Sequence, residues 1–137
     1  MSFQTHGQYS IKIEDNIIIV DAEGPFNDEL INAYQADYRS AMSQVCEKYK
    51  TWSQIIYLYH DSLLTPEAEE ELTKLNVAKN AQGLTHGAVI FVDTEGSNLL
   101  ATQFQRIYDK AGITVVFTTD LGDAKMWLKN QTQIEFK

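Results

Sequence analysis

The stretch "IIYLYHDSLLTPEAEEEL", residues 55–72, changes character halfway along its length. Its first six residues are apolar or aromatic, which is typical of a buried strand. Its last eight residues carry the signals of a helix start, because Thr65 is a good N-cap and Pro66 suits the first helical position. A buried strand followed closely by a helix is the building block of a parallel sheet, so this stretch points to an α/β fold.

The same alternation continues on both sides of this stretch. Five strands are predicted at 9–14, 17–24, 54–59, 87–93 and 113–119, and four helices at about 27–49, 65–83, 97–112 and 120–130. The order β-β-α-β-α-β-α-β-α predicts a five-stranded, mostly parallel mixed sheet with helices on both faces. The first strand is expected to be antiparallel and to lie at or near an edge.

Several residues are predicted to hold this fold together. Helix caps are expected at Asn27 or Asp28, at Thr65 and at Asp120, and helix ends at Gly83 and Gly112. The second helix is expected to turn Leu72, Leu75 and Ala78 inward. The continuous apolar runs of the strands predict that the following residues are buried: Ile18, Val20, Ile56, Leu58, Val89, Phe91, Val115 and Phe117.

The chain of 137 residues fits a single domain, with its core at about residues 8–130. "TW", residues 51–52, is interpreted as the close of the first helical segment. In the tail, residues 131–137, Ile134 and Phe136 alternate with polar residues, so we expect either an added edge strand or a frayed end.

Composition excludes some partners. The net charge of −8 and the presence of only two arginines, Arg39 and Arg106, argue against binding to nucleic acid or to anionic membranes. The N-terminus has no secretory signal pattern, and no apolar run reaches the roughly 20 residues that span a bilayer. The single cysteine, Cys46, cannot form an internal disulfide. We therefore expect a cytoplasmic protein.

Polar side chains follow the predicted strands, where ligands bind in open α/β sheets. They form an expected rim of Asp21, Glu23, His60, Asp61, Ser62, Asp93, Glu95, Thr119 and Asp120. One interpretation is a cation or phosphoryl site. The other, which we favour, is that these residues cap helices and solvate loops.

No recognisable catalytic constellation is present. Nucleotide-binding glycine motifs and a Gly-x-Ser-x-Gly elbow are absent from the sequence. His6, His60 and His86 are too widely separated for a zinc site, and the fifth strand lacks the lysine that a response-regulator receiver needs. We expect a protein that is not an enzyme and has neither metal nor cofactor.

The layout resembles the SpoIIAA-like branch of the STAS fold, a group of small bacterial proteins. The resemblance is carried by "IIIVDAEGPFNDELINAY" (17–34), "GAVIFVD" (87–93) and "VVFTTDLGDAKMWL" (115–128), and it covers roughly residues 8–130. It implies a non-enzymatic signalling or ligand-binding domain. In anti-sigma-factor antagonists of this fold, a serine in a D-S-S-G-type sequence after the third strand is phosphorylated.

This chain has "HDSLLTPEA" (60–68) at that place, so the switch pattern is incomplete. The candidate switch region is His60, Asp61, Ser62 and Thr65. We expect Thr65 to act mainly as a helix cap and Ser62 to matter less to stability.

Two function classes remain. The first is a protein-interaction module, and the second is a carrier that holds a small apolar molecule or lipid in a pocket between helices and sheet. Partners compatible with the sequence are a protein, a small apolar ligand and a second copy of the chain. The tyrosines either fill the core or line such a pocket: Tyr34, Tyr38, Tyr49, Tyr57 and Tyr59.

Overall fold

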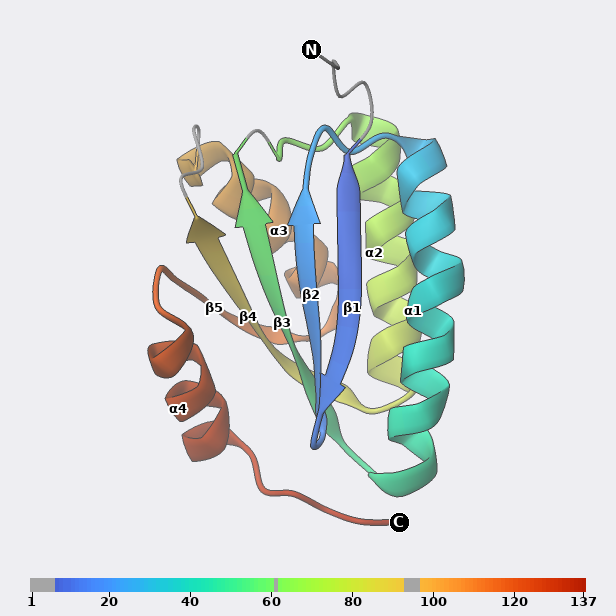
Figure 1. The fold of residues 1–137 in the computed structure, drawn as a ribbon, viewed down its shortest axis with the longest axis vertical. Coiled ribbons are helices and arrows are strands. Elements are labelled where there is room, and N and C mark those ends of the chain that lie inside the picture. Colours follow the sequence, from blue (N-terminus) through green and yellow to red (C-terminus); the bar gives the residue numbers. More distant parts are fainter. Residues whose placement is uncertain (1–6, 61, 93–96) are drawn as a thin grey trace.

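The structure is a computed structural model, which describes residues 7–60, 62–92 and 97–137 (Figure 1). Its elements run in the order β1 (Gln8–Glu14), β2 (Ile17–Glu23), α1 (Asp28–Lys48), β3 (Trp52–Tyr59), α2 (Pro66–Ala81), β4 (Leu84–Val92), α3 (Ser97–Ala111), β5 (Thr114–Thr118) and α4 (Leu121–Gln131). The predicted order of strands and helices is confirmed for the described part of the chain.

The strands lie in the sheet in their order along the sequence, β1-β2-β3-β4-β5. β1 pairs with β2 in antiparallel fashion, and the other pairs are parallel. Because right-handed crossovers that all step in one direction place their helices on one face, α1, α2 and α3 share a face. The fourth helix, α4, packs on the opposite face and lies at the lower left, beside the sheet, in Figure 1. The chain is therefore an α/β protein with a mixed sheet between two helical layers.

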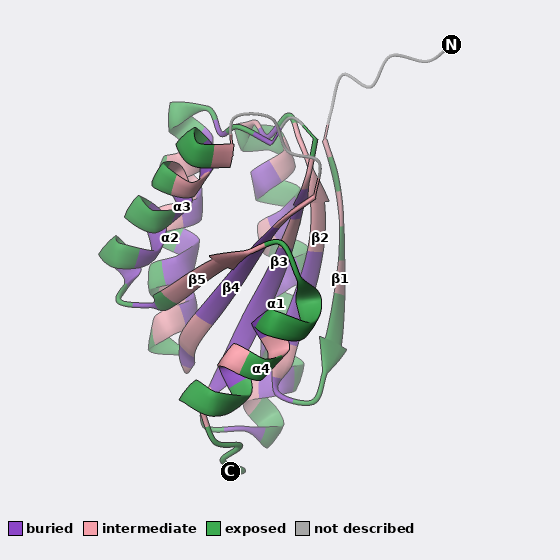
Figure 2. Cartoon of the chain, turned by 90° about the vertical axis from the view of Figure 1, so that its left-hand side faces the viewer, coloured by how far each residue is buried: buried purple, intermediate pink, exposed green. Residues whose placement is uncertain are grey.

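Each face of the sheet has its own core. Of the eight residues predicted to be buried, five are buried, and Phe91, Val115 and Phe117 are half-buried. These three lie on β4 and on the edge strand β5, where the sheet has fewer neighbours; β5 is drawn mainly in the intermediate colour in Figure 2. The smaller core under α4 consists of Ile19, Ile55, Ala88, Ile90, Ala124 and Leu128.

The predicted caps and helix ends are largely confirmed. The side chains of Asn27, Thr65 and Asp120 each accept a hydrogen bond from a backbone N–H in the first turn of α1, α2 and α4. Gly83 and Gly112 follow α2 and α3 with φ angles of +113° and +78°, a conformation that glycine adopts without strain.

Two boundary predictions need correction. Trp52 does not close the helical segment but begins β3, where its backbone pairs with Leu84 and its indole Nε1 donates to the carbonyl of Gln82 at 3.0 Å. The tail is neither an edge strand nor frayed. It pairs with the end of α1 through a β-bridge between Tyr49 and Phe136. Backbone hydrogen bonds between residues far apart in the sequence flank this bridge on both sides.

None of the helices within the described residues is both long enough and apolar enough to cross a bilayer.

Candidate functional site

The predicted strand-end rim is only partly described. Asp61, Asp93 and Glu95 lie outside the described residues. Asp120 caps α4 by accepting from Asp123 N at 2.9 Å, as the capping interpretation predicts. The described sheet has no reversal of strand order, so it lacks the crevice in which open α/β sheets usually bind ligands.

The rim brings Glu23 and His60 together. Nδ1 of His60 lies 2.7 Å from Oε1 of Glu23, and Gln8 donates a second hydrogen bond to the same carboxylate. Together these bonds hold the pKa of Glu23 below its ordinary value, with the His60 bond as the larger cause. The His60 side chain is 62% exposed, and exposed ion pairs contribute little to stability, so the pair is a surface contact rather than a site.

The candidate switch segment is anchored rather than free. The Ser62 side chain is buried, and its hydroxyl donates to the carbonyl of Tyr59 at 2.6 Å and accepts from Gly24 N at 3.4 Å. Thr65 is exposed and caps α2 by accepting from Ala68 N at 3.1 Å. Both hydroxyls are thus engaged in the fold, and the one on Ser62 is out of reach of a partner enzyme.

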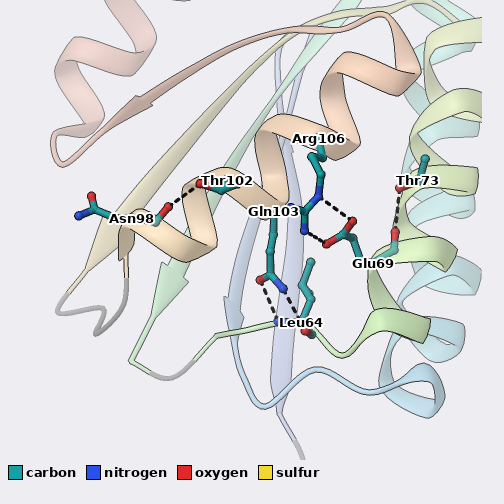
Figure 3. A network of polar contacts seen from close by, with 7 residues as sticks. All are labelled: Leu64, Glu69, Thr73, Asn98, Thr102, Gln103 and Arg106. Atoms are coloured by element: carbon teal, nitrogen blue, oxygen red, sulfur yellow. Dashed lines mark hydrogen bonds and ion pairs between the residues drawn. The ribbon is translucent and has the colours of Figure 1, made fainter.

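Helix α3 also holds this segment (Figure 3). The amide of Gln103 accepts from Leu64 N at 3.2 Å and donates to Leu64 O at 3.1 Å, as a neighbouring strand would. Beside it, Arg106 makes a two-pronged ion pair with Glu69 of α2 at 2.6 and 3.2 Å. Leu64, between Ser62 and Thr65, is therefore fastened to α3.

The described residues enclose a cavity of about 40 Å³ between α1, α2 and the sheet. Its walls are mostly apolar and come from Tyr9, Val20, Ala22, Phe26, Leu30, Ile31, Tyr34, Ile56, Leu58, Leu72, Asn76, Lys79 and Phe104. Of these, only Tyr9, Ala22 and Leu30 are half-buried, and the others are buried. The mouth of the cavity therefore lies between the start of β1, the end of β2 and the start of α1.

Lys79 is the unusual member of this wall. Its side chain is completely buried, although lysine is rarely buried in proteins. Its Nζ donates to Gln54 Oε1 at 3.0 Å and to Tyr34 Oη at 3.4 Å, and it lies 3.7 Å from the centre of the Tyr38 ring. None of the ion pairs in the described part of the chain includes Lys79. Burial therefore lowers the pKa of Lys79 well below its ordinary value.

A polar network surrounds this amine. Gln54 accepts from Tyr38 Oη at 2.6 Å and donates to Tyr108 Oη at 2.7 Å and to Asn76 Oδ1 at 3.4 Å. Burial raises the pKa values of Tyr34, Tyr38 and Tyr108, so these hydroxyls stay neutral. Lys79 is therefore surrounded by neutral hydrogen-bonding groups.

Sequence reasoning missed Lys79, but a signal was present. Leu72, Asn76 and Lys79 recur at spacings of four and three, which places them on one helix face together with Leu75. Ala78, which was predicted to face inward, is half-buried. The sequence analysis did not single out this lysine, because lysine is rarely buried.

The five tyrosines named from the sequence lie in different parts of the structure. Tyr34 lines the cavity and Tyr38 lies beside it under Lys79, whereas Tyr49 contacts Phe136 in the tail. Tyr57 and Tyr59 stack on the opposite face of the sheet, with ring centres 6.3 Å apart. The pocket between the first helix and the sheet thus uses one of the five predicted tyrosines, together with Tyr9.

Metal-ligating side chains do not cluster in the described residues, where no group of three or more His, Cys, Asp or Glu is arranged to hold an ion. His86 instead packs edge-on against Trp127 of α4, with ring centres 5.7 Å apart, and partial burial lowers its pKa. His6 lies outside the described residues.

Comparison with known proteins gives no family assignment, since no family model matches the chain and no curated protein matches its sequence.

Proposed function

We propose that this chain is a non-catalytic binding domain that holds a small, mainly apolar molecule in the cavity between α1 and α2. The observation that carries the proposal is the cavity itself, whose walls are apolar except at one buried end. Concave, mostly apolar sites with a few polar groups are the usual form of small-molecule sites.

The size of the cavity sets a requirement for binding. A cavity of about 40 Å³ has room for only a few water-sized groups, whereas a cavity that accepts benzene measures roughly 150 Å³. A bound molecule must therefore displace side chains at the mouth. Tyr9 and Leu30 are half-buried there, so they can move with less loss of packing than the buried walls.

We keep the protein-interaction module of the SpoIIAA-like family as a second proposal. It is supported by the element order, which the sequence resemblance implies, and by the sheet face opposite α1. On that face Tyr57 and Tyr59 are stacked and half-buried, and Tyr57 packs against the core under α4. Burial of the Ser62 hydroxyl argues against phosphorylation at that residue as its switch.

Titration with octanol, an uncharged amphiphile, tests the cavity proposal. We expect amide NMR shifts to change around Tyr9, Leu30 and Tyr34, and native mass spectrometry of freshly purified protein to show bound small molecules. Ala22→Phe should fill the mouth and abolish the shifts. Ala36→Phe introduces the same ring at an exposed position of α1 and should leave binding unchanged. Octanol binding that survives Ala22→Phe, or no binding at all, would contradict the proposal.

A further inference from the structure

The buried end of the cavity presents hydrogen-bond donors to its interior. Three polar residues line this end, Tyr34, Asn76 and Lys79. The Asn76 amide is already used, since its Nδ2 donates to Leu72 O at 2.8 Å and its Oδ1 accepts from Gln54. Tyr34 Oη accepts from Lys79, and its own proton has no acceptor among the described residues. A ligand atom at this end must therefore be an acceptor.

The charge of Lys79 narrows the chemical class of the ligand. Lys79 is buried and has no acidic partner among the described residues, and a buried charge without a counter-charge is costly. An anionic acceptor would supply the missing charge. One amine matches the single charge of a carboxylate better than the larger, more highly charged phosphate, and a carboxylate also fits the small space more readily.

On this basis, and resting on the proposed function, we propose that the bound molecule is an aliphatic monocarboxylate. Its carboxylate accepts hydrogen bonds from Lys79 Nζ and Tyr34 Oη at the buried end of the cavity. Its apolar chain runs along the walls toward the mouth at Tyr9 and Leu30, where it reaches solvent.

The test compares octanoate with octanol, which has the same chain and lacks the charge. With the intact chain, we expect octanoate to bind about tenfold or more tightly than octanol, because hydrogen bonds to charged groups are the stronger ones. Binding is followed by amide NMR shifts at concentrations below the onset of micelle formation.

Two substitutions in α2 distinguish a specific contact with the carboxylate from a general effect of positive charge. Lys79→Met should reduce octanoate affinity to that of octanol, whereas Lys74→Met removes an exposed lysine of α2 and should leave the preference intact. Tyr34→Phe removes the second donor and should weaken octanoate binding without affecting octanol.

The outcomes distinguish this inference from the proposed function. Equal affinity of the intact chain for octanoate and octanol would overturn the carboxylate assignment and leave the apolar binding site standing. A preference for octanoate that survives Lys79→Met would also overturn it. Failure of both compounds to bind would overturn the proposed function together with the inference. If Lys79→Met does not fold, the comparison of octanoate with octanol in the intact chain still tests the carboxylate assignment.

Discussion

Two buried serines near β3 differ in their hydrogen bonds. The Ser53 hydroxyl has no hydrogen-bond partner among the described residues, whereas the Ser62 hydroxyl is bonded to both Tyr59 and Gly24. A buried polar group without a partner is unfavourable, and a bonded one stabilises. The burial and contacts of Ser62 therefore argue against the sequence-based expectation that this residue matters less to stability than Thr65.

Alanine at the two positions should have opposite effects. Ser53→Ala should leave the free energy of unfolding unchanged or raise it by up to about 1 kcal/mol, and Ser62→Ala should lower it by about 1–2 kcal/mol. Urea denaturation at equal protein concentration measures both values. A loss on Ser53→Ala as large as that on Ser62→Ala would show that Ser53 has a partner in solution.

The buried amine of Lys79 makes stability depend on pH. Its folded pKa lies well below the value of 10.5 that the unfolded chain approaches. Between these two pKa values the unfolded state binds one more proton, so the free energy of unfolding rises with pH by up to about 1.4 kcal/mol per pH unit. Below the folded pKa this contribution is absent.

Replacing Lys79 with methionine should remove this dependence. We expect Lys79→Met to be more stable than the unmodified chain at neutral pH, by about 2 kcal/mol, because it removes the buried polar group. The difference should shrink as the pH rises toward 10.0, above which the buried tyrosines lower stability in both proteins, since their folded pKa values are raised. Urea midpoints measured over this range test the prediction. A constant difference would mean that Lys79 does not change its protonation there.

At the scale of elements, α3 contacts both α2 and the segment just before it, and we expect these two contacts to differ in strength. Gln103 pairs with both backbone groups of Leu64, which is buried, whereas the ion pair of Arg106 and Glu69 is partly exposed, with the arginine 49% accessible (Figure 3). Removal of the Gln103 amide leaves the two backbone groups of Leu64 without partners. Removal of the ion pair leaves side chains that water can solvate.

We therefore expect Gln103→Ala to lower the free energy of unfolding by about 1–3 kcal/mol, and Arg106→Ala by less than about 1 kcal/mol. Hydrogen exchange at Leu64 N should accelerate in Gln103→Ala and stay slow in Arg106→Ala. High salt should reduce the Arg106 contribution and leave that of Gln103 in place. Equal losses in the two variants would contradict this ranking.

Local signals in the sequence predicted the elements well. The caps at Asn27, Thr65 and Asp120 were predictable because capping depends on a few adjacent residues. The start of β3 at Trp52 and the pairing of the tail with Tyr49 were not, because both depend on partners distant in the sequence. The role of Lys79 was missed for the same reason, since only the packed fold shows that its helix face is fully covered.

At the scale of the whole molecule, charge determines which partners are tolerated. With a net charge of −8, the chain gains nothing from releasing counterions of a polyanion. We predict no electrophoretic shift of duplex DNA or RNA at micromolar protein and low salt. A shift that disappears with added salt would show that a basic surface outweighs the net charge.

The consecutive strand order also has a consequence for synthesis. Each of β2 to β5 pairs with the strand translated just before it, so the sheet can grow in the order in which the ribosome delivers it. The wall around Lys79 is different, because Phe104 of α3 belongs to it. A nascent chain that has released only β1 to β4 therefore has most of its sheet but an incomplete cavity wall. On this route the cavity that Lys79 lines is completed only after α3 has left the exit tunnel and docked.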